Sequence, residues 1–301
     1  MQKRVILLLL LLIQPLFSIG NYVENYEVFL RQYQNDGTLF LVTRRFELNH
    51  HVFYVTVNSQ TLQTKVLPLD ETKLQPISSA FKETLFAKRL SEATAQAKQG
   101  GMNHALTPST NHLYLTMDLC PSSKKGYESD FIQKLTQTSA QTPIAIAITS
   151  GWMDQHEKEF ESLRNNPALA ITWVNHTHTH FYDRTLDDQH NFMLREHTDV
   201  KGEILGLEKH LLNQGITPSV FFRFPGLMSN DALMKELREI YMLIPLGSNA
   251  WIAKNEKPKA DSFILIHGNK NEPLGIEMLQ KMLPELTKTY QFKPLLEAFV
   301  P

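Results

Sequence analysis

Short apolar runs alternate with segments of helical spacing over the last two-thirds of the chain, beyond Gly100-Gly101. Apolar runs of this length are typical of buried strands, and strands that alternate with helices form parallel βα units. The clearest helix, Val200–Gln214, has its leucines on one side and ends before Gly215. This alternation predicts an α/β domain over residues 101–301. Its predicted strands are Leu113–Met117, Ile144–Ile148, Ala168–Val174, Val220–Phe222, Tyr241–Ile244 and Phe263–Ile266.

Residues 21–100 have a different pattern. Alternating β-forming residues over Gly37–Thr43 and Val52–Val57, separated by a turn-like segment at 49–51, predict two strands. Ala80–Ala97 has apolar residues at helical spacing with charges between them, which predicts a helix before the two glycines. We therefore expect a small β-rich unit with one helix ahead of the α/β domain.

The first 20 residues resemble a secretory signal peptide. Lys3 and Arg4 precede an apolar run, Val5–Leu12, and small residues at Ser18 and Gly20 are typical of a cleavage site. The run is shorter than the roughly 20 apolar residues of a membrane span, although an uncleaved anchor is the alternative. We expect export to the periplasm or the extracellular space, with no stable membrane span after cleavage.

The composition restricts the partners and the stabilising bonds. Lys and Arg number 30 and Asp and Glu 31, so no global field favours binding to nucleic acid, whereas neutral polymers remain open as partners. Cys120 is the sole cysteine, so no intramolecular disulfide can form even in an oxidising compartment. The core of the protein must therefore provide its stability.

Four polar side chains follow four of the predicted strands at their carboxyl ends: Asp118, His176, Arg223 and His267. In a barrel of parallel strands this end carries the active site, because the βα loops converge there. Each residue has a simpler explanation on its own: Asp118 as a helix cap or turn, Arg223 in an ion pair, His267 in the core. Their common position predicts a shared site.

Three histidines alternate with threonines in the segment that runs from Asn175 to His180. Neutral imidazole is a good ligand for a divalent transition metal such as zinc. An extended backbone would put His176, His178 and His180 on one face, whereas a helical turn would bring the first and the last together. The segment predicts a metal site, and a histidine-rich polar loop is the alternative.

These motifs resemble those of the polysaccharide deacetylase family, the carbohydrate esterases with a NodB-homology domain. Thr116–Pro121 reads Thr-Met-Asp-Leu-Cys-Pro against the family's Thr-Phe-Asp-Asp-Gly-Pro, and 175–180 matches an asparagine-led His-x-x-x-His. Arg223–Gly226 matches Arg-x-Pro, and Leu265–His267 matches the final Leu-x-His. The resemblance covers about residues 105–300 and implies a distorted (β/α) barrel, preceded here by the β-rich unit.

In that family a metal held by two histidines and an aspartate binds the acetamido carbonyl and a water, and an N-acetyl group is hydrolysed from an amino sugar. Carried over by position, His176 and His180 would hold the metal and Asp118 would deprotonate the water. His267 would protonate the leaving amine, and Arg223 would keep Asp118 ionised. The implied substrate is a glycan: peptidoglycan, a chitin-like polymer or poly-N-acetylglucosamine.

Two aromatic residues near these motifs are the expected glycan contacts. Trp251 lies where the family places an aromatic residue near its fourth motif, and Phe224 lies inside the Arg-x-Pro match. Trp251 could equally be a core residue. Asn249 stands where the resemblance leads us to expect an acidic residue that supports the acid.

The first motif departs from the family at Leu119, which replaces the aspartate that ligates the metal. Three alternatives follow: Asp118 is a ligand rather than the base, another residue (Glu128, Cys120 or His178) completes the metal shell, or no metal binds. Cys120 shares a face with Asp118 if the strand continues, so it could be a thiolate ligand or only a small buried residue.

Two classes of function therefore remain open. One is an active deacetylase with a modified metal site, and the other is a degenerate deacetylase fold that binds glycan without turnover. An unrelated metal-dependent hydrolase on a barrel is a third alternative, because His-x-His at a strand end is not unique to one family. Arg223 and His267 have no evident role in a purely binding protein. Their presence favours the enzyme, with zinc as the expected ion.

Overall fold

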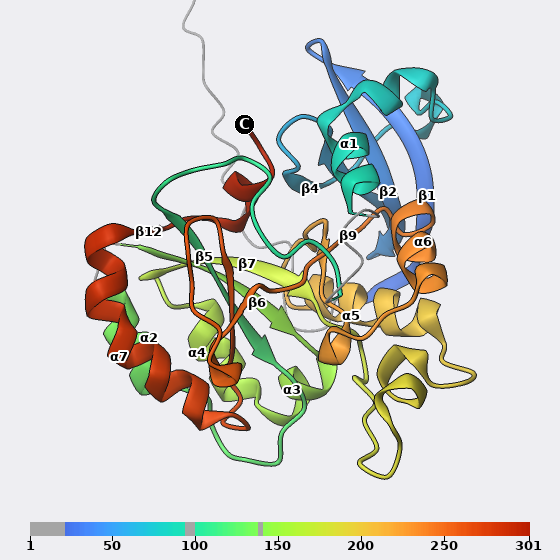
Figure 1. The fold of residues 1–301 in the computed structure, drawn as a ribbon. Coiled ribbons are helices and arrows are strands. Elements are labelled where there is room, and N and C mark those ends of the chain that lie inside the picture. Colours follow the sequence, from blue (N-terminus) through green and yellow to red (C-terminus); the bar gives the residue numbers. More distant parts are fainter. Residues whose placement is uncertain (1–21, 94–99, 138–140) are drawn as a thin grey trace, which may run out of the picture.

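The computed structural model describes residues 22–93, 100–137 and 141–301, and the predicted signal peptide at 1–20 lies outside them. These residues form a four-stranded antiparallel sheet and an eight-stranded sheet that is curled and covered by helices (Figure 1). Among the described helices, none is both long enough and apolar enough to cross a bilayer.

The larger sheet is parallel and contains the strands that the sequence predicts. Its order is β10-β11-β5-β6-β7-β8-β9, and β12 pairs with the start of β5. The predicted run Tyr241–Ile244 supplies only its last residue, because the chain still turns at Met242, where φ is 54°. The strands are β5 His112–Leu119, β6 Thr142–Ile148, β7 Leu169–Asn175, β8 Phe221–Phe222, β9 Ile244–Pro245, β10 Ala250–Trp251, β11 Phe263–His267 and β12 Gln291–Phe292.

Helices α2, α4 and α7 cover the outer face of this sheet (Figure 1). The predicted helix Val200–Gln214 is α5, which Asp199 caps by accepting a hydrogen bond from the Gly202 N–H at 2.9 Å. Gly215 follows it with a φ of 74°, the conformation that glycine favours after a helix. The helices are α2 Ser129–Thr136, α3 Ser150–Gln155, α4 Glu157–Arg164, α5 Val200–Asn213, α6 Asp231–Glu239 and α7 Pro273–Thr289.

Side chains of β5 alternate between the two faces of the sheet, as strand geometry requires. Its odd-numbered residues, Leu113 to Leu119, are buried in the core under the helices. Tyr114 instead joins the core on the inner face. Because Asp118 and Cys120 share the parity of Tyr114, this alternation directs them to the inner side and leaves Leu119 in the helix-covered core.

The antiparallel sheet is formed by the N-terminal part of the chain. The two predicted strands are present, and the turn between them has positive φ at Asn49 and His50, which suits a two-residue hairpin loop. The predicted helix 80–97 is a 3₁₀ turn, Ser79–Glu83, followed by α1, Leu85–Glu92, while residues 94–97 lie outside the described part. The strands are β1 Val23–Asn35, β2 Thr38–Leu48, β3 His51–Asn58 and β4 Thr64–Leu67.

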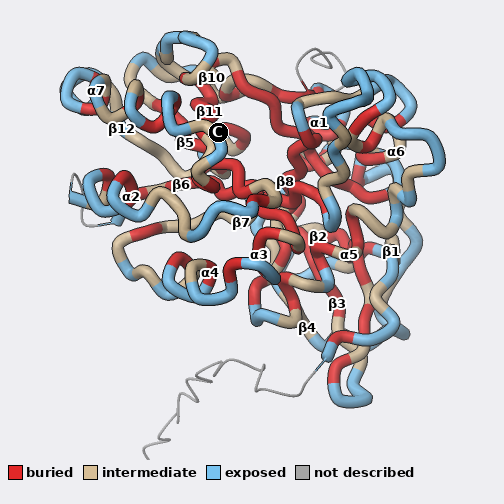
Figure 2. Tube along the Cα trace, turned by 90° about the horizontal axis from the view of Figure 1, so that it is seen from below, coloured by how far each residue is buried: buried red, intermediate tan, exposed pale blue. Residues whose placement is uncertain are grey.

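The N-terminal sheet shares a hydrophobic core with the parallel sheet. Leu41 of β2 and Phe86 of α1 pack in the same cluster as Ala145 of β6 and Phe221 of β8. Figure 2 shows buried residues running without interruption from the parallel strands into β2 and α1. The N-terminal unit therefore closes the inner face of the curled sheet.

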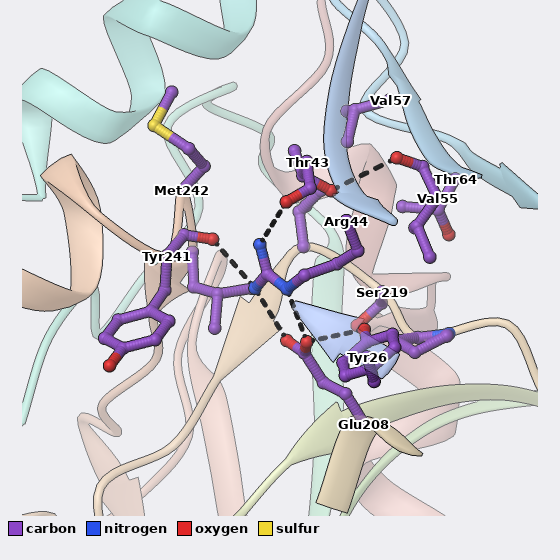
Figure 3. Close-up of a pocket in the computed structure, with 13 residues that line it drawn as sticks. Tyr26, Thr43, Arg44, Val55, Val57, Thr64, Glu208, Ser219, Tyr241 and Met242 are labelled. Carbon is purple, nitrogen blue, oxygen red and sulfur yellow. Dashed lines mark hydrogen bonds and ion pairs between the residues drawn. The ribbon is translucent and has the colours of Figure 1, made fainter. Parts of the chain in front are cut away.

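A buried ion pair joins the two sheets (Figure 3). Arg44 of β2 donates to both carboxylate oxygens of Glu208 on α5, at 2.7 and 2.9 Å, and the Tyr26 hydroxyl donates to Glu208 at 2.8 Å. Arg44 also donates to the Tyr241 carbonyl at 2.9 Å. The cavity beside these residues measures about 10 Å³, the space of a single water, so this is a packed joint rather than a ligand site.

Candidate active site

A cavity of about 770 Å³ opens at the carboxyl end of the parallel strands. Its volume lies in the usual range for sites that bind small ligands. The predicted residues that line it are Asp118, His176, His180, Trp251 and His267. The structure thus brings together side chains that lie up to 149 positions apart, as the strand-end pattern predicts.

Arg223 holds Asp118 from beneath the cavity. Its Nη1 donates to Asp118 Oδ1 at 2.6 Å and to Thr116 Oγ1 at 2.8 Å, and its Nη2 donates to the Gly247 carbonyl at 3.1 Å. Arg223 has no exposed surface and Asp118 is 3% exposed. A buried, hydrogen-bonded guanidinium stabilises the ionised carboxylate, and Asp118 Oδ2 remains directed at the histidines, 3.7 Å from His176 Nε2.

The histidine segment is neither a strand nor a helix but a tight turn. Thr177 and His180 have positive φ values of 77° and 51°, and the turn is held by Asn175, whose Oδ1 accepts from the Thr177 N–H at 3.0 Å. The Asn175 amide also donates to the Ile204 carbonyl of α5 at 2.9 Å. This turn brings the rings of His176 and His180 within 4.8 Å of each other. His178 is exposed and lies against Gly206.

Hydrogen bonding fixes which nitrogen of His176 faces the cavity. Its Nδ1 lies 2.9 Å from the Arg223 carbonyl oxygen, which can only accept, so Nδ1 donates to it and Nε2 is the nitrogen that faces Cys120 in the cavity. A second hydrogen bond of this kind is the usual support of a metal-ligating histidine. His180 Nε2 is buried and has no hydrogen-bond partner in the described part of the chain. A buried nitrogen without a partner is one that a bound metal ion could satisfy.

Cys120 is the residue that the structure brings to these histidines. The ligand atoms of Cys120, His176 and His180 all lie within 4.8 Å of one another, and Cys120 Sγ is 3.5 Å from His176 Nε2. Two donors on a tetrahedral zinc ion, one sulfur and one nitrogen, are about 3.6 Å apart from the ordinary bond lengths. Of the sequence alternatives for a third ligand, His178 points away and Glu128 precedes α2 without lining the cavity.

The electrostatic environment favours the thiolate at Cys120. Burial favours the neutral thiol, but the charges of His180 and His176 outweigh burial and hold the pKa of Cys120 well below its usual range. A thiolate and two imidazoles are a donor set that suits zinc. The residues present therefore fit a divalent metal with one thiolate, two imidazoles and an open position.

His267 also lines the cavity. It is the last residue of β11 and lies directly beside Asp118 of β5. Its Nδ1 donates to Glu272 Oε2 at 2.9 Å. Burial would lower the pKa of His267, but its hydrogen bonds to Cys120 and Glu272 raise that pKa well above the usual range. These contacts favour the protonated form of His267, which is the form that a general acid requires.

Sequence reasoning missed Glu272. It lies in the loop before α7, five residues after His267, and its carboxylate also accepts from Trp251 Nε1 at 3.0 Å. It supplies the acidic partner that was expected at position 249, where Asn249 instead accepts from the Phe263 N–H at 3.2 Å. One sequence signal could have found Glu272: it is a carboxylate five residues after His267, in the loop that follows the same strand, so it lies near the same strand end.

The two expected glycan contacts are placed differently from each other. Trp251 lines the cavity, but its N–H is engaged by Glu272 and one ring face is covered by Lys254, whose Nζ lies 3.5 Å from the ring centroid. Phe224 is 1% exposed and packs against Phe222 in the core, with ring centroids 4.9 Å apart. Phe224 does not line the cavity, so the expectation that it contacts substrate is corrected: the residue after Arg223 points to the opposite side of the backbone.

Comparison with solved structures identifies the fold. Bacillus subtilis PdaA, a family 4 carbohydrate esterase, matches with a TM-score of 0.51 at 14% identity, over 69% of this chain and 87% of that one. A family 4 carbohydrate esterase from Bacillus anthracis matches with a TM-score of 0.49 at 18% identity, covering 70% and 89%. A chitin deacetylase from the fungus Colletotrichum lindemuthianum matches with a TM-score of 0.48 at 18% identity, covering 65% and 90%.

A scan of known family models finds no match to the sequence. The structural likeness nonetheless confirms the predicted distorted (β/α) barrel, since the PdaA match extends over most of both chains. The chain therefore shares the fold of the family whose motifs its sequence resembles.

Proposed function

We propose that this chain is a metal-dependent deacetylase that hydrolyses N-acetyl groups of an amino-sugar polymer. One observation carries the proposal: three residues that could hold a metal, an arginine-held carboxylate, and a histidine whose contacts favour its protonated form all face one cavity. Amide hydrolysis needs these three parts, because it requires an activated water, a stabilised oxyanion and a proton for a poor leaving group.

Cys120, His176 and His180 would hold the metal, with zinc as the ion that this donor set favours. When bound there, the ion would polarise the acetamido carbonyl and lower the pKa of a water. The proposed third ligand is thus Cys120, which leaves Asp118 free for acid–base chemistry. Arg223 supports this division, because it occupies Oδ1 of Asp118 and leaves Oδ2 toward the histidines.

In the proposed reaction Asp118 Oδ2 accepts a proton from the attacking water, whose oxygen forms a bond to the acetyl carbon. His267, held by Glu272, then donates its proton to the amide nitrogen as the carbon–nitrogen bond breaks. The products are acetate and a free amino group on the sugar. Glu272 contributes by orienting the imidazole and by stabilising its charge, since its carboxylate faces the nitrogen that does not transfer the proton.

The substrate class and the compartment are part of the same proposal. Peptidoglycan, a chitin-like polymer or poly-N-acetylglucosamine provides N-acetylated sugars, and a chitin deacetylase is among the proteins of similar fold. All of these polymers lie outside the cytoplasm. The signal-like residues 1–20 agree with export to the periplasm or the extracellular space.

The test is to purify the protein without residues 1–20, measure bound metal by mass spectrometry, and assay acetate release from N-acetylglucosamine oligomers and peptidoglycan. We expect about one zinc per chain, its loss in His176→Ala, and acetate release reduced by at least about 1000-fold in Asp118→Asn. His178→Ala is the matched control, because this histidine belongs to the same segment but is exposed and points away from the cluster. It should keep both metal and activity.

Acetate release that persists in both His176→Ala and Asp118→Asn would refute the mechanism. Protein that carries no metal, binds oligomers tightly and releases no acetate would instead favour a glycan-binding module on a deacetylase fold.

A further inference from the structure

We propose that Tyr182 forms a second sugar-binding subsite, in which its ring stacks on a neighbouring, non-reacting sugar of an amino-sugar oligomer. This inference rests on the proposed deacetylase function, and it makes the enzyme selective for polymers over single sugars. Tyr182 is 54% exposed and lines the wall of the active-site cavity.

A continuous row of aromatic rings leads from the floor of the cavity to its rim. The rings of His176 and His180 are 4.8 Å apart, and His180 meets Phe192 edge-on at 5.6 Å and 85°. Phe192 in turn stacks on Tyr182, with centroids 5.1 Å apart and planes at 20°. The rings of His180 and Phe192 therefore lie between Tyr182 and the buried His176, and we place the neighbouring sugar on Tyr182 and the reacting acetamido group at the candidate metal site.

The loop that carries this pair is held in place by a buried side chain. Asn191 has no exposed surface; its amide donates to the Asp183 carbonyl at 2.6 Å, and its oxygen accepts from the Asp183 N–H at 2.9 Å. The same oxygen accepts from the Phe192 N–H at 3.2 Å. Asn191 ties together the residues that adjoin both rings. The stacked pair of Tyr182 and Phe192, which we call the platform, is therefore held in place before any sugar binds, and this lowers the entropic cost of binding.

Gly226 makes room for this arrangement. A Cβ at position 226 would lie 2.6 Å from Cε2 of Phe192, and the residue has a φ of 62°. The glycine of the Arg-Phe-Pro-Gly segment therefore admits the Phe192 ring against the wall of the cavity. The Phe192 ring thus packs against the segment that also carries Arg223, which links the platform to the candidate active site.

The chemistry of the subsite suits a pyranose ring. An exposed phenol ring offers a flat apolar face with a polar edge, which matches the apolar face and the hydroxyl rim of a sugar. Asp188 also lines the cavity and is exposed, so its carboxylate can accept hydrogen bonds from sugar hydroxyls. Trp251, by contrast, has one face covered by Lys254. Tyr182 is thus the cavity-lining ring with a largely open face.

The test compares kcat/KM for acetate release from single N-acetylglucosamine and from its tetramer, because only the tetramer can place a second sugar on Tyr182. In Tyr182→Ala we expect the preference for the tetramer to fall about tenfold, with the change in KM rather than in kcat. Tyr182→Phe should restore the preference, because it keeps the ring. Leu186→Ala is the matched control, since Leu186 is an exposed apolar residue of the same loop that does not line the cavity, and its preference should be unchanged.

Binding measurements separate this inference from the proposed activity. Calorimetry of the tetramer on Asp118→Asn protein, with and without Tyr182→Ala, measures the subsite without turnover, and we expect about tenfold weaker binding in the double variant. Equal tetramer affinity in the two proteins would overturn the subsite even if acetate is released normally. A loss of affinity that depends on Tyr182, together with native protein that releases no acetate, would retain the subsite and reject the enzyme.

Discussion

Position 120 carries a thiol at the point where the resembled motif has glycine, and position 119 carries leucine in place of the second aspartate. Strand alternation explains how this pair of changes can leave a working site. Leu119 points into the core under the helices, whereas Cys120 faces the histidines. In the proposed site, Cys120 thus supplies the third ligand that Leu119 cannot supply.

Replacing the thiol tests this exchange directly. Cys120→Ser should lower zinc affinity by more than about 100-fold, because the donor set loses its thiolate. With cobalt in place of zinc, the native protein should show a thiolate-to-cobalt charge-transfer band in the near ultraviolet, and Cys120→Asp should bind cobalt without that band. The chain has no other cysteine, so the band has a single source.

An unchanged zinc affinity in Cys120→Ser, or a charge-transfer band that survives in Cys120→Asp, would contradict ligation by Cys120. Asp118 would then be the carboxylate ligand, as one of the alternatives from the sequence allows.

At the scale of elements, the turn between β7 and α5 positions His176 and His180, the two histidines of the proposed metal site. Thr177 is fully buried with a φ of 77°, a conformation that costs about 1–3 kcal/mol for a residue other than glycine. The hydrogen bonds of Asn175 to the Thr177 N–H and to the Ile204 carbonyl compensate for it. The turn therefore depends on contacts with a helix that begins 25 residues later.

Asn175→Ala should lower the free energy of unfolding by about 1–3 kcal/mol, because it leaves the buried Thr177 N–H without a partner and removes the bond to the Ile204 carbonyl of α5. It should also weaken zinc binding, because the histidine turn loses its anchor. Urea denaturation and zinc titration measure the two effects. Asp199→Ala is the control: it removes the cap of the same helix at a cost of about 1 kcal/mol but should leave zinc affinity unchanged. Zinc affinity reduced equally in both variants would mean that stability alone controls the site.

For the whole molecule, the packing of the N-terminal sheet against the α/β part is the feature on which overall stability depends most. Val57 and Phe86 of the N-terminal part share a core with Val174 and Ile244 of the parallel sheet, and the Arg44–Glu208 pair is 2% exposed at each side chain. The parallel sheet thus buries its inner face against residues 22–93. We expect the α/β part alone to lack a complete core.

Removing one partner of this ion pair should be costly. Glu208→Gln should destabilise the protein by about 3–5 kcal/mol, because Arg44 then remains as a buried charge without a counterion. The double variant Arg44→Met, Glu208→Leu should recover a large part of this loss, since apolar residues of similar volume can replace a buried pair. Urea denaturation should show one transition for both sheets in each protein. Two separate transitions, or equal stability of Glu208→Gln and native protein, would show that the sheets fold independently.

Local patterns were sufficient to predict β5, β6, β7, β8 and β11, helix α5, and the placement of Asp118, His176, Arg223 and His267 at strand ends, whereas β10 and β12 were not predicted and β9 was predicted only at its first residue. These features depend on short-range periodicity and on the rule that parallel strands present their carboxyl ends on one side. β1 was not predicted, because polar and charged residues interrupt its alternation and its pairing with β2 supplies the order.

The chain by itself determined which side chains would reach one end of the sheet, because strand periodicity and chain order are local properties. Only the tertiary structure decided that Cys120 joins His176 and His180, that Glu272 supports His267, and that Tyr182 stands open at the rim. These contacts join separate βα loops. Their geometry depends on turns such as the one held by Asn175 and on packing across the core, and a single sequence does not encode either in a readable pattern.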